Sequence, residues 1–106
     1  MSQPIIITCA CPNHEEAAAL ARLLLAKKLI ACAQLSAPIR SLYWWKGEIC
    51  DEGEVLLGMK SLDVRYPDIE RLILARHSYE TPEIVAWPLT RISADYLAWL
   101  REVVDV

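Results

Sequence analysis

Glycine is scarce in this chain, which has only three glycines among its 106 residues. A phosphate-binding loop needs several closely spaced glycines, so the sequence excludes a P-loop. The Gly-x-Ser-x-Gly pattern of hydrolases and the His-Glu-x-x-His pattern of zinc proteases are missing too. We therefore predict that the protein is not an enzyme, with one alternative left open, a nucleophilic pair formed by Cys9 and His77.

A basic surface and a long apolar run are also absent. The net charge is −3 and the lysines and arginines form no stripe, which argues against nucleic acid as the main partner. No apolar run approaches the roughly 20 residues that span a bilayer, and the first four residues lack a basic signal-peptide segment. We expect a cytoplasmic protein that binds neither nucleic acid nor membrane.

Four cysteines are present, but nothing in their spacing suggests a disulfide framework, so we expect reduced thiols. The length predicts one domain over residues 1–106. Apolar residues make up 55 % of the chain, above the ~45–50 % usual for a soluble domain. Surplus apolar surface is typical of a protein that forms subunit interfaces.

Periodicity predicts alternating strands and helices. Asn13 can cap the first helix, with Glu16 in the capping-box position, and Pro38 predicts a bulge, a bend or a sheet edge in the following extended segment. Asp63 and Ser93 are the expected caps of the two later helices. The predicted elements are a strand at 4–10, a helix from 14 to about 28, an extended segment at 29–45, a returning strand at 48–61, a helix containing Pro67, a strand at 84–89 and a terminal helix after 93.

This order predicts an α+β fold, a ferredoxin-like βαββαβ sandwich with a C-terminal helix. Both main helices should lie on one face of an antiparallel sheet. The other face should stay open, which again calls for partner subunits.

Three aromatic residues, Tyr43, Trp44 and Trp45, precede a turn expected near Gly47. Successive strand residues point to opposite faces, so Trp44 should face away from its two neighbours. Large rings on both sides of a two-stranded hairpin favour burial between subunits. A cage for a cationic ligand is the alternative function for these rings.

Four stretches together resemble the divalent-cation tolerance proteins called CutA, and the resemblance spans nearly the whole chain. They are Ser41 to Glu48, the Glu54 and Lys60 pair, His77 to Ile84, and Tyr96 to Leu100. The resemblance implies a homotrimer whose long hairpins reach across subunits, an architecture similar to PII signalling proteins, and an association with copper or other divalent cations.

Cys9 and His77 are the candidate metal ligands, because they occupy the positions of the Cys and His that the resemblance associates with copper. Arg76 stands where a second His can occur. Cys9 and Cys11 would share one face if the strand continues, and Cu(I) prefers such thiolates. The structural alternatives are a buried core thiol and a histidine at a helix end.

Tyr79, Glu80 and Glu83 are the candidate residues of a polar cleft, together with Lys60. The same side chains can instead lock a trimer interface, which we favour. The predicted function is thus that of a homotrimeric copper-binding or divalent-cation-binding tolerance protein. Two alternatives remain, a PII-like sensor of a small ligand, which includes anionic ligands, bound by Lys60, Arg76 and Tyr79, and a trimeric scaffold.

Overall fold

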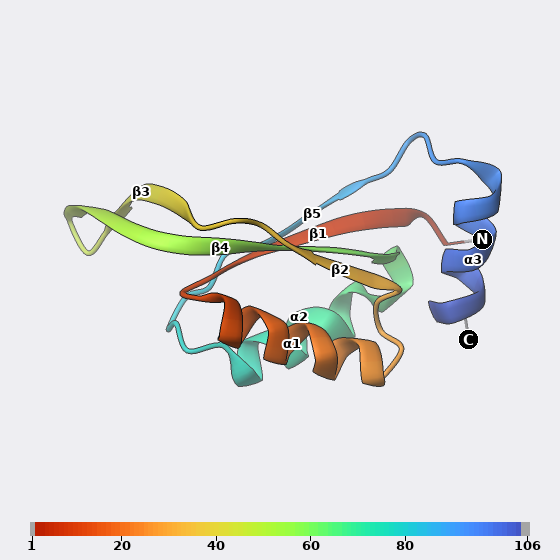
Figure 1. The fold of residues 1–106 in the computed structure, drawn as a ribbon, viewed down its shortest axis with the longest axis horizontal. Coiled ribbons are helices and arrows are strands. Elements are labelled where there is room, and N and C mark those ends of the chain that lie inside the picture. The colour runs from red at the N-terminus through yellow and green to blue at the C-terminus, as the bar shows by residue number, and fades with distance from the viewer. Residues whose placement is uncertain (1, 105–106) are drawn as a thin grey trace.

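The computed structural model describes residues 2–104 and has the predicted α+β arrangement (Figure 1). Residues 1, 105 and 106 of the predicted domain lie outside the described residues. The elements are β1 (Pro4–Cys11), α1 (His14–Ala26), β2 (Cys32–Leu35), β3 (Ile39–Trp45), β4 (Glu48–Leu62), α2 (Tyr66–Arg76), β5 (Ile84–Pro88) and α3 (Ala94–Val104), with a short 3-10 turn at Asp63–Arg65. None of the described helices is long and apolar enough to cross a membrane.

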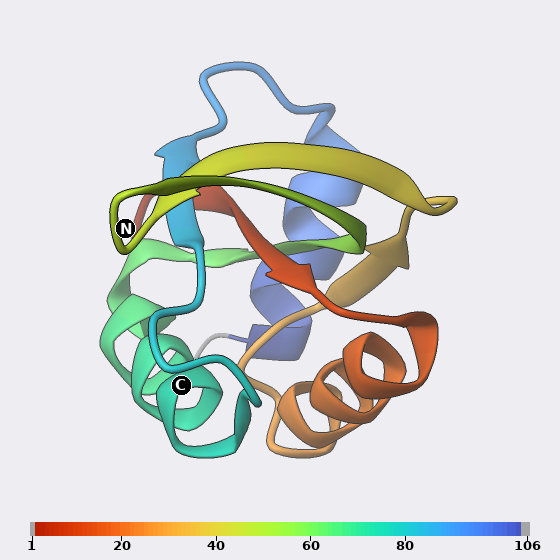
Figure 2. The same ribbon diagram turned by 90° about the vertical axis from the view of Figure 1, so that its left-hand side faces the viewer.

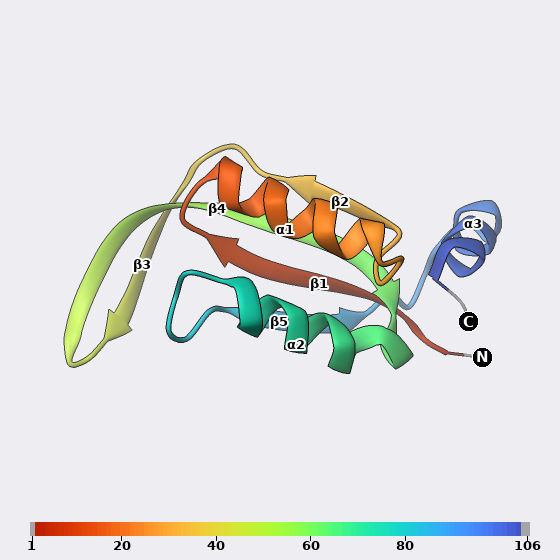
Figure 3. The same cartoon turned by 90° about the horizontal axis from the view of Figure 1, so that it is seen from below.

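The sheet is antiparallel and its strands lie in the order β2-β4-β1-β5, while β3 pairs with the part of β4 that projects beyond the sheet. Helices α1 and α2 lie side by side on one face (Figures 1 and 3). Helix α3 packs at the end of the sheet near the N-terminus. The α+β fold with a terminal helix and a long hairpin is therefore confirmed.

The core forms between the sheet and these two helices. Alternate residues of β1, namely Ile5, Ile7, Cys9 and Cys11, are buried in it, as the period of two in a strand requires. The helices contribute apolar residues spaced three or four apart. These are Ala17, Leu20, Ala21 and Leu24 of α1 and Ile69 and Ile73 of α2.

A bulge separates β2 from β3 at the predicted position. Leu35 pairs with Leu57 and Ile39 pairs with Glu54, so the first strand advances four residues while β4 advances three. The N–H of Ser36 donates to the carbonyl of Leu56 at 2.9 Å within this bulge. An extra residue increases local twist, and here the β3–β4 hairpin curves out of the sheet (Figures 2 and 3).

The hairpin turns through Lys46 and Gly47, which both have positive φ (51° and 80°), as a two-residue turn between twisted strands requires. Trp44 pairs with Ile49 and faces away from Tyr43 and Trp45, as predicted. The exposed fractions are 71 % for Trp44 and 64 % for Ile49, so the outer face of the hairpin is uncovered in the single chain.

The two predicted helix caps at Asn13 and Asp63 have different outcomes. The side chain of Asn13 accepts the N–H of Glu16 at 2.8 Å, so that predicted cap is confirmed. The predicted Asp63 cap is wrong, because the N–H of Asp63 donates to the carbonyl of Gln3 at 2.7 Å and a 3-10 turn follows. Helix α2 consequently begins at Tyr66, with a proline in its first turn.

Candidate functional site

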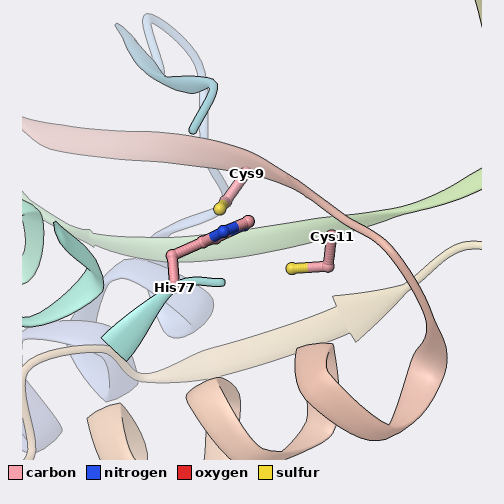
Figure 4. A group of neighbouring side chains, drawn as sticks. All are labelled: Cys9, Cys11 and His77. Carbon is pink, nitrogen blue, oxygen red and sulfur yellow. The ribbon is translucent and has the colours of Figure 1, made fainter. Parts of the chain in front are cut away.

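The C-terminal half of β1 and the end of α2 bring Cys9, Cys11 and His77 together (Figure 4). One potential ligand atom from each residue lies within 4.8 Å of the other two. Both thiols are fully buried, as is the His77 side chain. Among residues 2–104, it is the one group of three metal-ligating side chains whose ligand atoms lie close enough to hold a single ion.

The cluster exists because β1 is longer than predicted. The strand continues through Cys11, which pairs with Val55, so the two thiols point to the same face. His77 is the C-cap of α2, and its N–H donates to the carbonyl of Ile73 at 2.8 Å. The sulfur atoms both point toward its ring (Figure 4).

Both ring nitrogens of His77 already have partners. Nδ1 accepts the N–H of Tyr79 at 3.0 Å, so Nε2 carries the proton and donates to the carbonyl of Ala10 at 2.8 Å. These two hydrogen bonds fix the tautomer of the imidazole, with its proton on Nε2. Neither nitrogen has a free lone pair, and coordination of a metal requires one of these two hydrogen bonds to break.

The two thiols influence each other directly. Hydrogen bonding to Cys11 and burial together raise the pKa of Cys9 well above its ordinary value. The same hydrogen bond lowers the pKa of Cys11, against the opposing effect of burial. Cys11 therefore loses its proton more readily than Cys9, and a cation bound between the sulfurs would favour the loss of both protons.

Glu16 closes the cluster from outside. Its Oε2 accepts the N–H of Ser78 at 3.2 Å and the hydroxyl of Ser78 at 3.0 Å, and it lies 3.5 Å from Nδ1 of His77. The capping-box residue thus holds the loop after α2.

Tyr79, Glu80 and Glu83 line a neighbouring cleft of about 800 Å³ between that loop and the β3–β4 hairpin. The Tyr79 hydroxyl donates to Oε2 of Glu54 at 2.9 Å. Burial, followed by this hydrogen bond, raises the pKa of Tyr79, which keeps the hydroxyl protonated as a donor. Tyr43, Trp44 and Trp45 also line the cleft.

Lys60 does not join these residues, and its predicted place in the cleft is wrong. It lies six residues from Glu54 along β4, roughly 20 Å in an extended strand, and its Nζ donates to Oε1 of Gln34 at 2.9 Å. Arg76 is exposed and does not line this cleft either. The proposed anionic-ligand residues are therefore not gathered around Tyr79.

The sequence offered Cys11 as a metal ligand only on the condition that the strand continued, and it did not place Glu54 in the cleft. The two-residue spacing from Cys9 was the signal for Cys11, and it depended on where β1 ends. Glu54 directly precedes the buried Val55, and its exposed fraction is only 6 %. A charged residue adjoining an apolar strand is a weak signal, because its burial comes from a loop 25 residues away.

Comparison with known proteins gives consistent results. Residues 5–103 match the family described as CutA1 divalent ion tolerance protein. The divalent-cation tolerance protein CutA of Thermus thermophilus is 35 % identical over 102 residues, or 96 % of this chain and 97 % of that protein. The human protein CutA is 36 % identical over 95 residues, which cover 90 % of this chain and 53 % of the human protein.

Solved structures show the same fold. CutA1 from Shewanella sp. SIB1 superposes with a TM-score of 0.94 at 32 % identity, covering 99 % of this chain and 98 % of that one. The protein described as periplasmic divalent cation tolerance protein CutA from Archaeoglobus fulgidus gives a TM-score of 0.93 at 35 % identity, with coverage of 96 % and 99 %.

Proposed function

This chain belongs to the CutA1 family of divalent ion tolerance proteins, and from that premise we propose that it binds copper through Cys9, Cys11 and His77. The observation that carries the proposal is the gathering of two thiols and an imidazole within 4.8 Å. The two thiolate sulfurs are soft donors and favour Cu(I) over hard divalent ions such as Mg²⁺, and an imidazole nitrogen also suits copper.

The separation of the donor atoms supports this proposal. Two thiolates bound to one ion at ~2.3 Å in tetrahedral geometry lie ~3.8 Å apart. The donor atoms, all within 4.8 Å, therefore need to contract by about 1 Å at most. The imidazole must in addition release Tyr79 or Ala10, so its contribution to the affinity is smaller than that of the sulfurs.

Thiol ligands lose their protons when they bind a metal, so the proposed site has a defined pH dependence. The raised pKa of Cys9 means that copper must displace a proton from this sulfur at neutral pH. Copper affinity should accordingly rise with pH.

Competition with a chromogenic Cu(I) chelator in reduced protein tests the site. Cys9→Ser and Cys11→Ser should each weaken binding about tenfold or more, and His77→Gln should weaken it less. Cys50→Ser is the matched control, since Cys50 lies on the hairpin opposite Tyr43 and is partly exposed. Equal affinities of the Cys9, Cys11 and Cys50 variants would refute the site.

We further propose that the chain works as a homotrimer in the cytoplasm. Leu42, Trp44 and Ile49 are all more than 60 % exposed on one face of the hairpin, and an uncovered apolar face of this kind is typical of a subunit interface. The free thiols of the copper site agree with a reducing compartment. Sedimentation equilibrium that shows a monomer at micromolar concentration would refute the trimer.

A catalytic role for the Cys9 and His77 pair is not part of this proposal. The thiolate is the nucleophilic form of cysteine, and the raised pKa of Cys9 disfavours it. Nδ1 of His77 also accepts a backbone N–H, so it does not act as a base toward the thiol.

A further inference from the structure

The carboxylate of Glu16 faces the metal cluster from the first turn of α1. The Asn13 cap fixes that turn, since the side chain of Asn13 accepts the N–H of Glu16. The Glu16 side chain is only 23 % exposed, whereas the adjacent Glu15 is open to solvent. The structure thus turns one of two neighbouring glutamates toward His77, and copper binding by two thiols and an imidazole uses neither of them.

The two ring nitrogens of His77 face different parts of the structure. Nε2 donates to the carbonyl of Ala10, the residue between the two cysteines, so it is the nitrogen that faces β1. Nδ1 faces the loop and α1 instead, with the N–H of Tyr79 at 3.0 Å and Oε2 of Glu16 at 3.5 Å. Nε2 is therefore the nitrogen placed to bind an ion that the two sulfurs hold.

Binding through Nε2 reverses the hydrogen-bonding roles of the ring. Nε2 must give up its proton to offer a lone pair, and the neutral imidazole then carries its proton on Nδ1. The ring releases one proton to solvent and takes one up, so its charge does not change. Nδ1 becomes a donor, and the N–H of Tyr79, itself a donor, can no longer be its partner. The ring then requires an acceptor on the side that faces away from β1.

Glu16 supplies that acceptor. The 3.5 Å between its Oε2 and Nδ1 needs to shorten by less than about 1 Å to reach the ~2.8 Å of a hydrogen bond to a carboxylate. The carboxylate already accepts from the N–H and the hydroxyl of Ser78, and its two oxygens offer enough lone pairs for a third donor. Because these bonds hold the carboxylate in place, its direction is fixed before the third bond forms.

Two other roles for Glu16 agree less well with this geometry. The three ligand atoms that lie within 4.8 Å of one another come from Cys9, Cys11 and His77 and do not include its carboxylate. A carboxylate oxygen is also a harder donor than Cu(I) prefers. A favourable interaction with the helix N-terminus applies equally to Glu15 and requires no contact with His77. Support of the imidazole accounts for the contacts that only Glu16 makes.

We propose, given the copper binding proposed for this cluster, that Glu16 is a positioning residue of the site, which accepts the Nδ1 proton of His77 when Nε2 binds the ion. A histidine that binds a metal commonly donates its other N–H to a carboxylate or a carbonyl, which fixes the ring and raises the basicity of the ligand nitrogen. Glu16 thereby selects the tautomer in which His77 can act as a ligand, a tautomer opposite to that of the metal-free chain.

Heteronuclear NMR of the imidazole nitrogens of His77 tests the tautomer in reduced, full-length protein before and after addition of Cu(I), which is diamagnetic. We expect the proton on Nε2 in the metal-free protein and on Nδ1 in the copper-bound protein. A proton that stays on Nε2 while the sulfurs bind copper would overturn the role of Glu16 and leave the thiol site standing. A parent chain that binds no copper would instead refute the proposed function, and the role of Glu16 with it.

A double-mutant cycle shows whether Glu16 acts through the imidazole. Glu16→Gln should weaken Cu(I) binding about threefold, because a neutral amide is a poorer acceptor than a carboxylate. The loss should not exceed that of His77→Gln, since Glu16 acts only through this ring. In a chain that already carries His77→Gln, the substitution of Glu16 should no longer weaken binding. Equal weakening by Glu16→Gln with and without the imidazole would contradict the assignment.

The sign of the effect separates the hydrogen bond from simple charge. Cu(I) bound by two thiolates carries a net negative charge, so removal of a nearby carboxylate charge alone would strengthen binding. Weakening by Glu16→Gln therefore reports the lost hydrogen bond. Glu15→Gln is the matched control, because it removes the same charge from the exposed neighbour and should not weaken binding. Stronger binding in Glu16→Gln, or equal weakening in the two variants, would overturn the role of Glu16.

Discussion

The hydroxyl of Tyr79 donates a 2.9 Å hydrogen bond to the Glu54 carboxylate, 25 residues away in the sequence. The backbone N–H of the same tyrosine donates to His77 at 3.0 Å. Tyr79 therefore fixes the loop after α2 to β4 and also orients the imidazole of the metal cluster. One residue thus links the two candidate sites.

The first prediction concerns the stability that this bond provides. Tyr79→Phe should lower the free energy of unfolding by about 1–3 kcal/mol, because it leaves a buried carboxylate without its donor. Urea denaturation measures the change. Tyr66→Phe is the control, since Tyr66 bonds at 3.1 Å to Glu70, which is less buried than Glu54, and should cost less. A larger loss in the control would contradict the importance of Glu54 burial.

Helix capping gives the second prediction. Asn13→Ala should destabilise the protein by about 1 kcal/mol, because the N–H of Glu16 loses its acceptor. Asn13→Ser should retain most of the stability, since a serine hydroxyl also caps well. Thermal unfolding of both variants checks this. Equal midpoints for the alanine and serine variants would mean that the cap contributes nothing.

The third prediction is a loss of stability at alkaline pH that involves Tyr96. A 3.3 Å contact with Cys32, and then burial, raise its pKa from 10.0 to about 12. Between these values the unfolded chain loses the proton while the folded chain keeps it, so unfolding becomes more favourable as pH rises. The contribution of Tyr96 is fully present below about pH 10 and lost through about pH 12.

Urea denaturation between pH 9 and about pH 11 checks this prediction. Stability of the parent chain should fall over that range, and it should fall less steeply in Tyr96→Phe, which has no proton to lose. Cys9 and the other tyrosines with raised pKa values supply the residual slope in both proteins. Identical slopes would show that Tyr96 titrates equally in the folded and unfolded chains.

The fourth prediction separates assembly from folding. Trp44 is 71 % exposed in the single chain, so Trp44→Ser should remove little packing within the subunit but weaken the proposed trimer. Sedimentation velocity should show dissociation at concentrations where the parent chain remains assembled. Leu74→Ser is the control, because Leu74 is 55 % exposed on α2, away from the hairpin. Dissociation of both variants alike would argue against a hairpin interface.

Local features were predictable from the sequence because each depends on residues close to one another. The Asn13 cap spans three residues, the turn at Gly47 needs positive φ, and Pro38 interrupts pairing wherever its strand lies. The short, continuous apolar run along β1 likewise predicted a buried central strand. The element order that follows from these patterns permitted the α+β fold to be predicted.

The sites depended on tertiary contacts that no local pattern encodes. His77 meets Ala10 across 67 residues, and Glu54 is buried only because the loop carrying Tyr79 folds back on β4. Lys60 shares a strand with Glu54, yet strand geometry places it far from the cleft. Sequence spacing determined which residues share a face, whereas packing of α2 and its loop against the sheet decided which of them meet.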